Sequence, residues 1–243
     1  MEISLAEIAI VCGAVFVSGF FHGTVGFGGG LIAVGLMGRF LGVRDASIVV
    51  TFPTLILTVT VFFQLRKHAS LSWTIPLILA SFIGIHFGLT FLLTAQRRVL
   101  ELAAGVFMIA TAVYVMVPRL AHKRWHPVYM GVPCGLFSGL ISGAFASGGP
   151  PVVAYMATQN LGRLEFVGSL QSVFIIMCLF RLGHLGVDGV LTPRVLVIGM
   201  FAAVSILAGS MFGVRLLKRL SDRLMKRIVI ALLIVLGCLY LVK

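Results

Sequence analysis

The feature that most constrains this chain is a glycine-rich stretch that occurs twice in the same register. Residues 18–30 read SGFFHGTVGFGGG, and residues 138–150, 120 positions later, read SGLISGAFASGGP. A serine and four glycines are identical at matching positions, and each copy lies inside apolar sequence that continues after it. A backbone that leaves the helix between apolar segments must be covered by protein or by a wet cavity. We therefore expect two helix breaks that face one central binding site.

The segments around these breaks are apolar enough to cross a membrane. The chain is 60% hydrophobic and only 11% charged, and runs of about twenty apolar residues, enough to cross about 30 Å of hydrocarbon, recur throughout. The net charge of +12 raises the alternative of a nucleic-acid-binding protein. The basic residues instead lie in short loops, where they orient a membrane protein and meet anionic lipid. The sequence predicts an all-α polytopic membrane protein that has membrane lipid, and no nucleic acid, as a partner.

Both halves of the chain follow the same order of elements. Each begins with a long helix that ends at a glycine stretch, continues with a short apolar run, and ends with three longer helices. Asp45 ends a loop at residues 42–45 and would cap the next helix. Glu165 lies 120 residues later, again before a helix. The expected helices cover residues 3–22, 46–64, 72–93, 99–117, 128–145, 166–182, 191–207 and a last segment ending near 242, with short runs at 31–41 and up to 160. We divide the chain into a first repeat, 1–117, a basic connector, 118–126, and a second repeat, 127–243.

The distribution of basic residues indicates how many membrane elements each half contains, because such residues accumulate on the cytoplasmic side. If the chain turns back at each break, each half has five elements, and 12 basic residues share one side against 7 on the other. The smaller group includes Arg181. If one spanning element crosses each break, the division is 11 to 8. The count and the short runs favour five elements, so we expect inverted repeats with both termini outside the cytoplasm.

A new helix starts after each break, and a helix start favours negative charge. Its first N–H groups have no partner within the helix, and the helix dipole is positive there. Two such starts that point into one cavity make an anion site, and proline suits the first helical turn. The candidate residues at the two starts are Gly28, Gly29, Gly30, Gly148, Gly149 and Pro150. The competing interpretation is that the glycines only allow helices to pack closely.

Polar side chains near the breaks extend this candidate site. His22 and Ser142 occupy matching positions before the breaks, and Thr51 and Gln171 match in the helices that follow. A histidine at membrane depth is a functional candidate by default. The alternatives are packing for His22, and capping or interhelical hydrogen bonding for Thr51 and Gln171. The polar candidates are His22, Thr24, Thr51, Ser142, Ser147 and Gln171.

The remaining ionisable and sulfur-containing residues indicate no other chemistry. The seven acidic residues lie near expected helix ends or loops, so nothing supports a site driven by carboxylates. A buried carboxylate would also repel an anion. His22 is the candidate group if a proton is the coupling ion. The four cysteines lie apart within apolar runs, so we expect them to pack, and we expect no metal, cofactor or catalytic residue.

The motif GFGGGL at residues 26–31, together with SGGPP at 147–151, resembles the paired motifs of the TauE/SafE family of membrane transporters, also called sulfite exporters. The resemblance covers nearly the whole chain, because both repeats and their order match. It implies transport of a small anion such as sulfite, a sulfonate or sulfoacetate across a bacterial inner membrane. The motif glycines and Pro150 become binding-loop candidates. The first copy has Gly30-Leu31 where the second has Pro150-Pro151. Whether both breaks contact the ligand equally is therefore an open question.

These observations lead to one functional prediction. We expect a secondary transporter, and not an enzyme, that moves a small anion by alternating access and exports it. An anion channel and a non-transporting membrane scaffold or assembly protein are the alternatives. The anion, the direction, the coupling ion and the oligomeric state, for which a homodimer is one candidate, are open at this point.

Overall fold

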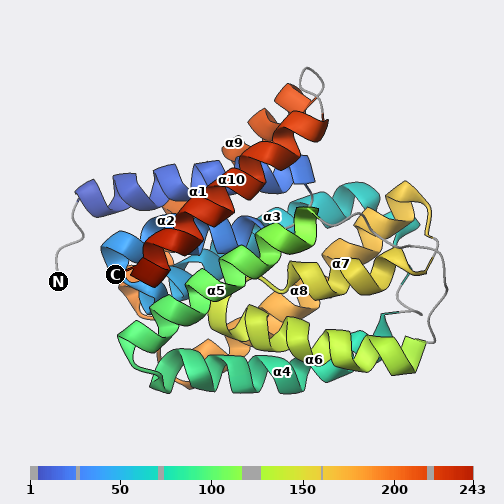
Figure 1. Cartoon of the computed structure of the whole chain (residues 1–243), viewed down its shortest axis with the longest axis horizontal. Helices are drawn as coiled ribbons and strands as arrows, with labels where there is room; N and C mark the ends of the chain where they lie inside the picture. Colours follow the sequence, from blue (N-terminus) through green and yellow to red (C-terminus); the bar gives the residue numbers. More distant parts are fainter. Residues whose placement is uncertain are drawn as a thin grey trace.

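The computed structural model of the chain describes residues 5–25, 28–70, 74–116, 127–159, 161–217 and 222–242, and these form α-helices joined by short turns (Figure 1). The first half contains α1 (Leu5–Val25), α2 (Gly29–Leu41), α3 (Val43–Leu65), the short 3-10 turn η1 (Arg66–His68), α4 (Ile75–Thr94) and α5 (Arg97–Met116). The second half contains α6 (Pro127–Phe145), α7 (Gly149–Ala157), α8 (Arg163–Val187), α9 (Pro193–Leu217) and α10 (Asp222–Val242).

Six of the described helices are long and apolar enough to cross a membrane, with mean hydropathies between 1.6 and 2.3. These are α1, α3, α4, α5, α8 and α9. By contrast, α2 has 13 residues and α7 only 9, so each covers a part of the hydrocarbon thickness. Large apolar side chains such as Phe87 and Val204 lie exposed on the surface, where lipid would cover them. The expected class, an all-α polytopic membrane protein, is confirmed.

The helices of the two halves correspond one to one, and the halves are inverted. Figure 1 shows that α1 enters from the end of the molecule where α10 finishes and that α2 returns to that same end. The second broken helix, α6, enters from the opposite end, and α7 returns there. We call the first of these the α10 end; α2, α4, α8 and α10 all finish at it. The chain thus turns back at each break, as the arrangement of five elements per half requires.

The two halves interlock through glycines on the long helices. α1 packs along α9 of the other half, and α6 packs along α4 in the equivalent arrangement. A side chain on Gly19 would run into the Ile206 carbonyl oxygen, and one on Gly139 into the Ser81 carbonyl oxygen. Close packing of helix backbones is the usual role of small residues in membranes. The packing interpretation therefore holds for these early glycines of each stretch.

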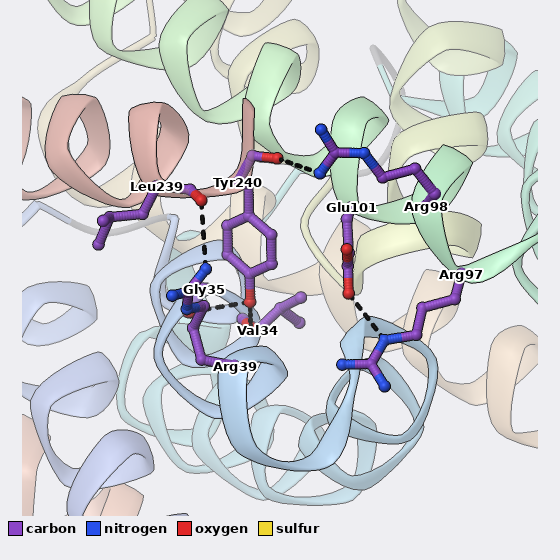
Figure 2. Close-up of polar contacts among 8 residues, drawn as sticks. All are labelled: Val34, Gly35, Arg39, Arg97, Arg98, Glu101, Leu239 and Tyr240. Atoms are coloured by element: carbon purple, nitrogen blue, oxygen red, sulfur yellow. Dashed lines mark hydrogen bonds and ion pairs between the residues drawn. The ribbon is translucent and has the colours of Figure 1, made fainter. Parts of the chain in front are cut away.

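At the α10 end, three side chains hold the last turn of α10 against α2 and α5 (Figure 2). Tyr240 donates its hydroxyl to the Gly35 carbonyl oxygen of α2, 3.1 Å away. Arg39 of α2 donates to the Leu239 carbonyl oxygen at 3.2 Å, and Arg98 of α5 donates to the Tyr240 carbonyl oxygen at 3.4 Å. The last carbonyl groups of a helix lack partners within it and carry the negative end of its dipole, so arginines are favourable there. These bonds tie the second half to the first.

The expected loop at residues 42–45 and the expected cap at Asp45 are wrong. Gly42 alone joins α2 to α3, and it has φ 87, a conformation that glycine adopts without strain. The residue before α3 is therefore Gly42, and Asp45 lies inside the first turn of the helix. A carboxylate in the first turn still interacts favourably with the helix dipole. The chain reverses here through the conformation of a single glycine, without a multi-residue loop.

The expected position of Arg181 near a loop is also wrong. α8 continues to Val187, beyond the expected end at residue 182. Arg181 lies inside this helix and is only 1% exposed. A buried arginine cannot report on the side of a membrane, so the smaller group of basic residues falls from 7 to 6 against 12. Arg181 also belongs to the smaller group of the alternative arrangement, which falls from 8 to 7 against 11, so the correction leaves the preference for five elements per half unchanged.

Candidate functional site

The first break joins α1 to α2 through Gly28. This residue has φ 84 and ψ −4, a left-handed conformation that suits glycine, and no side chain caps the start of α2. Ser18 of α1 donates its hydroxyl to the Gly29 carbonyl oxygen, 2.6 Å away. The bond ties the start of α2 to α1 and occupies a carbonyl oxygen of the break. The first N–H groups of α2 have no partner within the helix.

The second break repeats the serine bond with a different backbone. Ser138 of α6 donates its hydroxyl to the Gly148 carbonyl oxygen, again at 2.6 Å. The left-handed residue here is Ala146, with φ 53, whereas Gly148 has φ −87 and ψ 12. No side chain caps the start of α7, and two prolines, Pro150 and Pro151, stand in its first turn. Both breaks therefore present an uncapped helix start.

The two breaks meet at the centre of the molecule. Gly30 lies so close to the second break that a side chain on it would run into the Ala146 carbonyl oxygen. A small cavity of about 30 Å³ lies between the breaks and the middle turns of α3 and α8. This central cavity is lined by His22, Gly28, Gly29, Gly30, Thr54, Ser142, Ala146, Ser147, Gly148, Gly149, Phe174, Met177 and Cys178. The starts of α2 and α7 thus contribute to one space.

Three polar side chains in the central cavity have no hydrogen-bond partner among the described residues. Their unpaired atoms are Nε2 of His22, Oγ of Ser147 and Oγ1 of Thr54. These side chains are buried, with 5%, 6% and 9% of their surface exposed respectively. Leaving a buried polar group unpaired costs about 1–3 kcal/mol, so the cavity is suited to water or a ligand that supplies the partners. None of the thirteen lining residues carries a carboxylate.

Eight of the twelve expected site residues line the central cavity: His22, Gly28, Gly29, Gly30, Ser142, Ser147, Gly148 and Gly149. Thr51 and Gln171 do not line it. The Thr51 hydroxyl donates to the Ser47 carbonyl oxygen of its own helix at 3.0 Å, and Gln171 is buried in α8. Pro150 is buried in the first turn of α7 without lining the cavity. The side chain of Thr24 lies outside the described residues.

The sequence pointed to the two helices beside the breaks, and the structure brings a different turn of each to the cavity. Thr54 lines the cavity three residues after Thr51, and Phe174 lines it three residues after Gln171, so the 120-residue register holds for the lining pair. Cys178, expected only to pack, lines the cavity one turn further along α8. The repeat register could have indicated these positions. The rotation of each helix about its axis, which decides the turn that faces the site, depends on tertiary packing.

The arrangement suits a small anion with several acceptor oxygens. The start of α2 supplies several free N–H donors, whereas at the start of α7 Pro150 and Pro151 have no N–H and Gly149 is the donor. Both starts supply the positive end of a helix dipole. The hydroxyls of Thr54, Ser142 and Ser147 are further donors on the cavity wall. Phe174 and Met177 form an apolar wall on the α8 side, which lowers the local dielectric and strengthens electrostatic contacts. The site therefore combines a positive potential with a space that only a small solute fits.

Comparison with known families gives a match over nearly the whole chain. The family model described as sulfite exporter TauE/SafE matches residues 11–240, which include both breaks and nearly the whole chain. Neither a curated protein nor a solved structure matches this chain. The matched family is one of membrane transporters, in agreement with the apolar helices and the central cavity. The chain therefore belongs to the sulfite exporter TauE/SafE family.

Proposed function

We propose that this protein is a secondary transporter that exports sulfite, or a similar small oxyanion such as a short sulfonate, by alternating access. One observation carries the proposal: the uncapped starts of α2 and α7, from opposite halves, line the same cavity. His22 and Ser147 add unpaired polar atoms to that cavity, and no lining residue is acidic. Cavities with these properties favour an anion over a cation or a neutral apolar solute.

The buried position of the polar lining supports a carrier rather than a channel. A channel needs a continuous wet path, whereas His22, Ser142 and Ser147 are each at most 6% exposed. In a carrier, the inverted halves rock about a fixed central site, so that it opens to one side at a time. The first N–H groups of α2 and the Gly149 N–H of α7 would hold the anion during the exchange, and the three hydroxyls would orient its oxygens.

Ligand-dependent stability of the purified protein tests the proposed anion site. A ligand that binds only the folded protein stabilises it by about 2.7 kcal/mol at 100 times its Kd. We expect thermal unfolding in detergent to shift upwards with sulfite and methanesulfonate, and not with choline. Sulfate is included because it is the oxidation product of sulfite. A protein that no anion stabilises, in detergent or in nanodiscs, would contradict the proposed function.

Transport in proteoliposomes distinguishes a carrier from a channel. Vesicles are loaded with unlabelled sulfite, and labelled sulfite is added outside at a lower concentration. A carrier accumulates the label transiently against its gradient by exchange, whereas a channel only equilibrates it. Transient accumulation of the label is the expected result. Simple equilibration would show that the protein is a channel and not a carrier.

The orientation of the protein is a separate proposal, that both termini face the periplasm of a bacterial inner membrane. It is supported by the 12 basic residues on the opposite side. Reporter fusions to each terminus check it: alkaline phosphatase should be active at both, and a cytoplasmic fluorescent reporter at neither. Opposite results at the two termini would exclude an odd number of elements in each half.

A further inference from the structure

Arg181 is a buried charge near the centre of the molecule that the proposed site does not use. It belongs to α8, the helix that also contributes Phe174, Met177 and Cys178 to the central cavity. Only 1% of its surface is exposed, and it is one of the largest side chains that are fully buried. A guanidinium stays protonated under all ordinary conditions, so this position holds a permanent positive charge.

The hydrogen bonds of Arg181 leave most of its donors unused. Its Nη2 donates to the Ser47 hydroxyl at 2.8 Å, and that hydroxyl donates to the Ala144 carbonyl oxygen at 2.9 Å. Nε and Nη1 have no partner among the described residues. The ion pairs in the described part of the chain join Arg97 with Glu101, His184 with Asp188, and Arg194 with Glu7. No described carboxylate therefore balances the charge of Arg181.

The position of Arg181 relates it to the central cavity. It follows the cavity residue Cys178 by three residues and precedes the end of α8 by six, which correspond to about 4.5 Å and about 9 Å along the helix. Its tether reaches Ala144, two residues before the cavity residue Ala146. Ser47 lies near the start of α3, at the α10 end of the molecule. Arg181 thus lies between the cavity and the α10 end.

A purely structural role would not explain the unused donors. Arg181 lies near the last turn of α6, whose dipole is negative there, but the nearby Ala144 carbonyl oxygen is already bound by Ser47. A buried charge without a partner is strongly unfavourable, and buried charges are normally paired and hydrogen-bonded. The matching residue of the first half is Val61, so the repeat does not require a charge at this position.

We propose that Arg181 is a second anion-binding residue, whose missing counter-charge is the transported oxyanion on its way between the central cavity and the α10 end. This inference rests on the proposed function. The anion, held first by the two helix starts, contacts the free Nε or Nη1 of Arg181 when that side opens. Because only the second half carries this charge, the path is more attractive to anions on the α10 side than on the opposite side.

Substitution of Arg181 with neutral residues tests this role. Arg181→Met keeps the volume and packs, and Arg181→Gln keeps an N–H donor for Ser47. Sulfite affinity is measured by its effect on thermal unfolding and by equilibrium dialysis with labelled sulfite. We expect both variants to bind sulfite about thirtyfold more weakly or worse, as when one partner of a buried charge pair is removed. Without ligand they should be as stable as the wild type or more so, because an unpaired buried charge is gone.

Two further variants separate charge from structure. Arg181→Lys keeps a positive charge and should recover most of the affinity. Arg44→Met removes the same charge at the α10 end, where Arg44 only binds the Leu92 and Ala95 carbonyl oxygens, and should leave sulfite binding unchanged. If the wild type binds sulfite and both neutral Arg181 variants bind it equally well, Arg181 is structural and this inference is overturned while the proposed function stands. If the wild type binds no anion, both fail.

Discussion

The two helix breaks share a sequence pattern and a serine bond, yet their backbones differ. In the first break Gly28 takes the left-handed conformation, with φ 84. In the second break the equivalent glycine, Gly148, has φ −87, and Ala146 is left-handed with φ 53. A left-handed conformation costs a residue with a side chain about 1–2 kcal/mol. Symmetry of sequence therefore preserves the anchoring of each break, but not its local strain.

The half-helices that follow the breaks are held to different degrees. α2 has 13 residues, packs against α1, α3 and α10, and is bound to α10 through Gly35 in its middle and Arg39 near its end. α7 has 9 residues and packs mainly against α6 and α8. The second break thus combines the strained residue with the shorter, less supported helix. Changes in the second break should consequently affect ligand binding more readily than the same changes in the first.

The largest expected effect comes from Gly30, where the two breaks touch. Gly30→Ala places a side chain against the Ala146 carbonyl oxygen, which belongs to backbone and cannot rotate away. We expect loss of sulfite binding and transport with normal insertion into the membrane. Gly13→Ala is the matched control, because a side chain there meets nothing within 4 Å and alanine favours the helix. A Gly30→Ala protein with normal transport would mean that contact between the breaks is unimportant.

The same test extends to the other positions of the breaks. Bulky residues at Gly29 and Gly149 should abolish transport while leaving insertion intact. At Gly29, even a single added side-chain carbon would lie only 3.0 Å from the Ser18 hydroxyl oxygen. Unchanged transport in both variants would count against the two breaks as the binding site.

The next effect concerns the two serine bonds. Ser18→Ala and Ser138→Ala each remove the hydrogen bond that ties a half-helix start to the long helix before it, so each should lower the free energy of unfolding by about 0.5–1.5 kcal/mol. Sulfite affinity should fall more in Ser138→Ala, because α7 has fewer other contacts. Ser172→Ala is the control, since the Ser172 hydroxyl binds only the Gly168 carbonyl oxygen of its own helix. Equal losses of affinity in the first two variants would contradict the proposed difference between the breaks.

A smaller effect is expected from His22, which stands in the first break where Ser142 stands in the second. The unpaired Nε2 of His22 belongs to a side chain that lines the cavity, where the ring can donate a hydrogen bond to an anion. Methanesulfonate is a suitable probe, because its charge does not change with pH over the ordinary range. His22→Ala should weaken methanesulfonate binding, whereas His68→Ala, at an exposed position, should leave it unchanged. Equal binding by the wild type and His22→Ala would mean that His22 only packs.

The smallest effects distinguish the backbones of the two breaks. Gly28→Ala meets no atom within 4 Å but must adopt φ 84, so it should lower the free energy of unfolding by about 1–2 kcal/mol. Ala146→Gly relieves the same strain in the second break. It also costs about 0.5–1 kcal/mol, because glycine loses more conformational entropy on folding than alanine. Its net effect should be neutral or stabilising. Chemical denaturation in mild detergent would measure both, and a destabilised Ala146→Gly would show that Ala146 is not strained.

Particular residues show how far the sequence alone could go. The 120-residue register located both breaks, and it placed His22 and Ser142 on matching walls of the cavity. It also pointed to α3 and α8, but selected Thr51 and Gln171 in place of Thr54 and Phe174, one turn away. Hydrophobic periodicity could not correct this error, because helices buried in protein and lipid are apolar on nearly every face.

Arg181 illustrates a second kind of error. An arginine inside an apolar run is a functional signal at membrane depth, and this signal was present in the sequence. The expected helix end at residue 182 places Arg181 near a loop, whereas α8 ends at Val187 and encloses it. Helix ends in apolar sequence depend on tertiary contacts and on the membrane boundary, so composition alone locates them poorly.

The sequence by itself determined the class of this protein, its repeat and its two uncapped helix starts, because apolar length and glycine geometry act locally and leave few alternatives. Only the tertiary structure decided that these starts meet in one cavity, that α1 pairs with α9 and α6 with α4, and that Arg181 is buried without a counter-charge. Each of these depends on which helix faces come together, and that choice is made by the packing of side chains from distant parts of the chain.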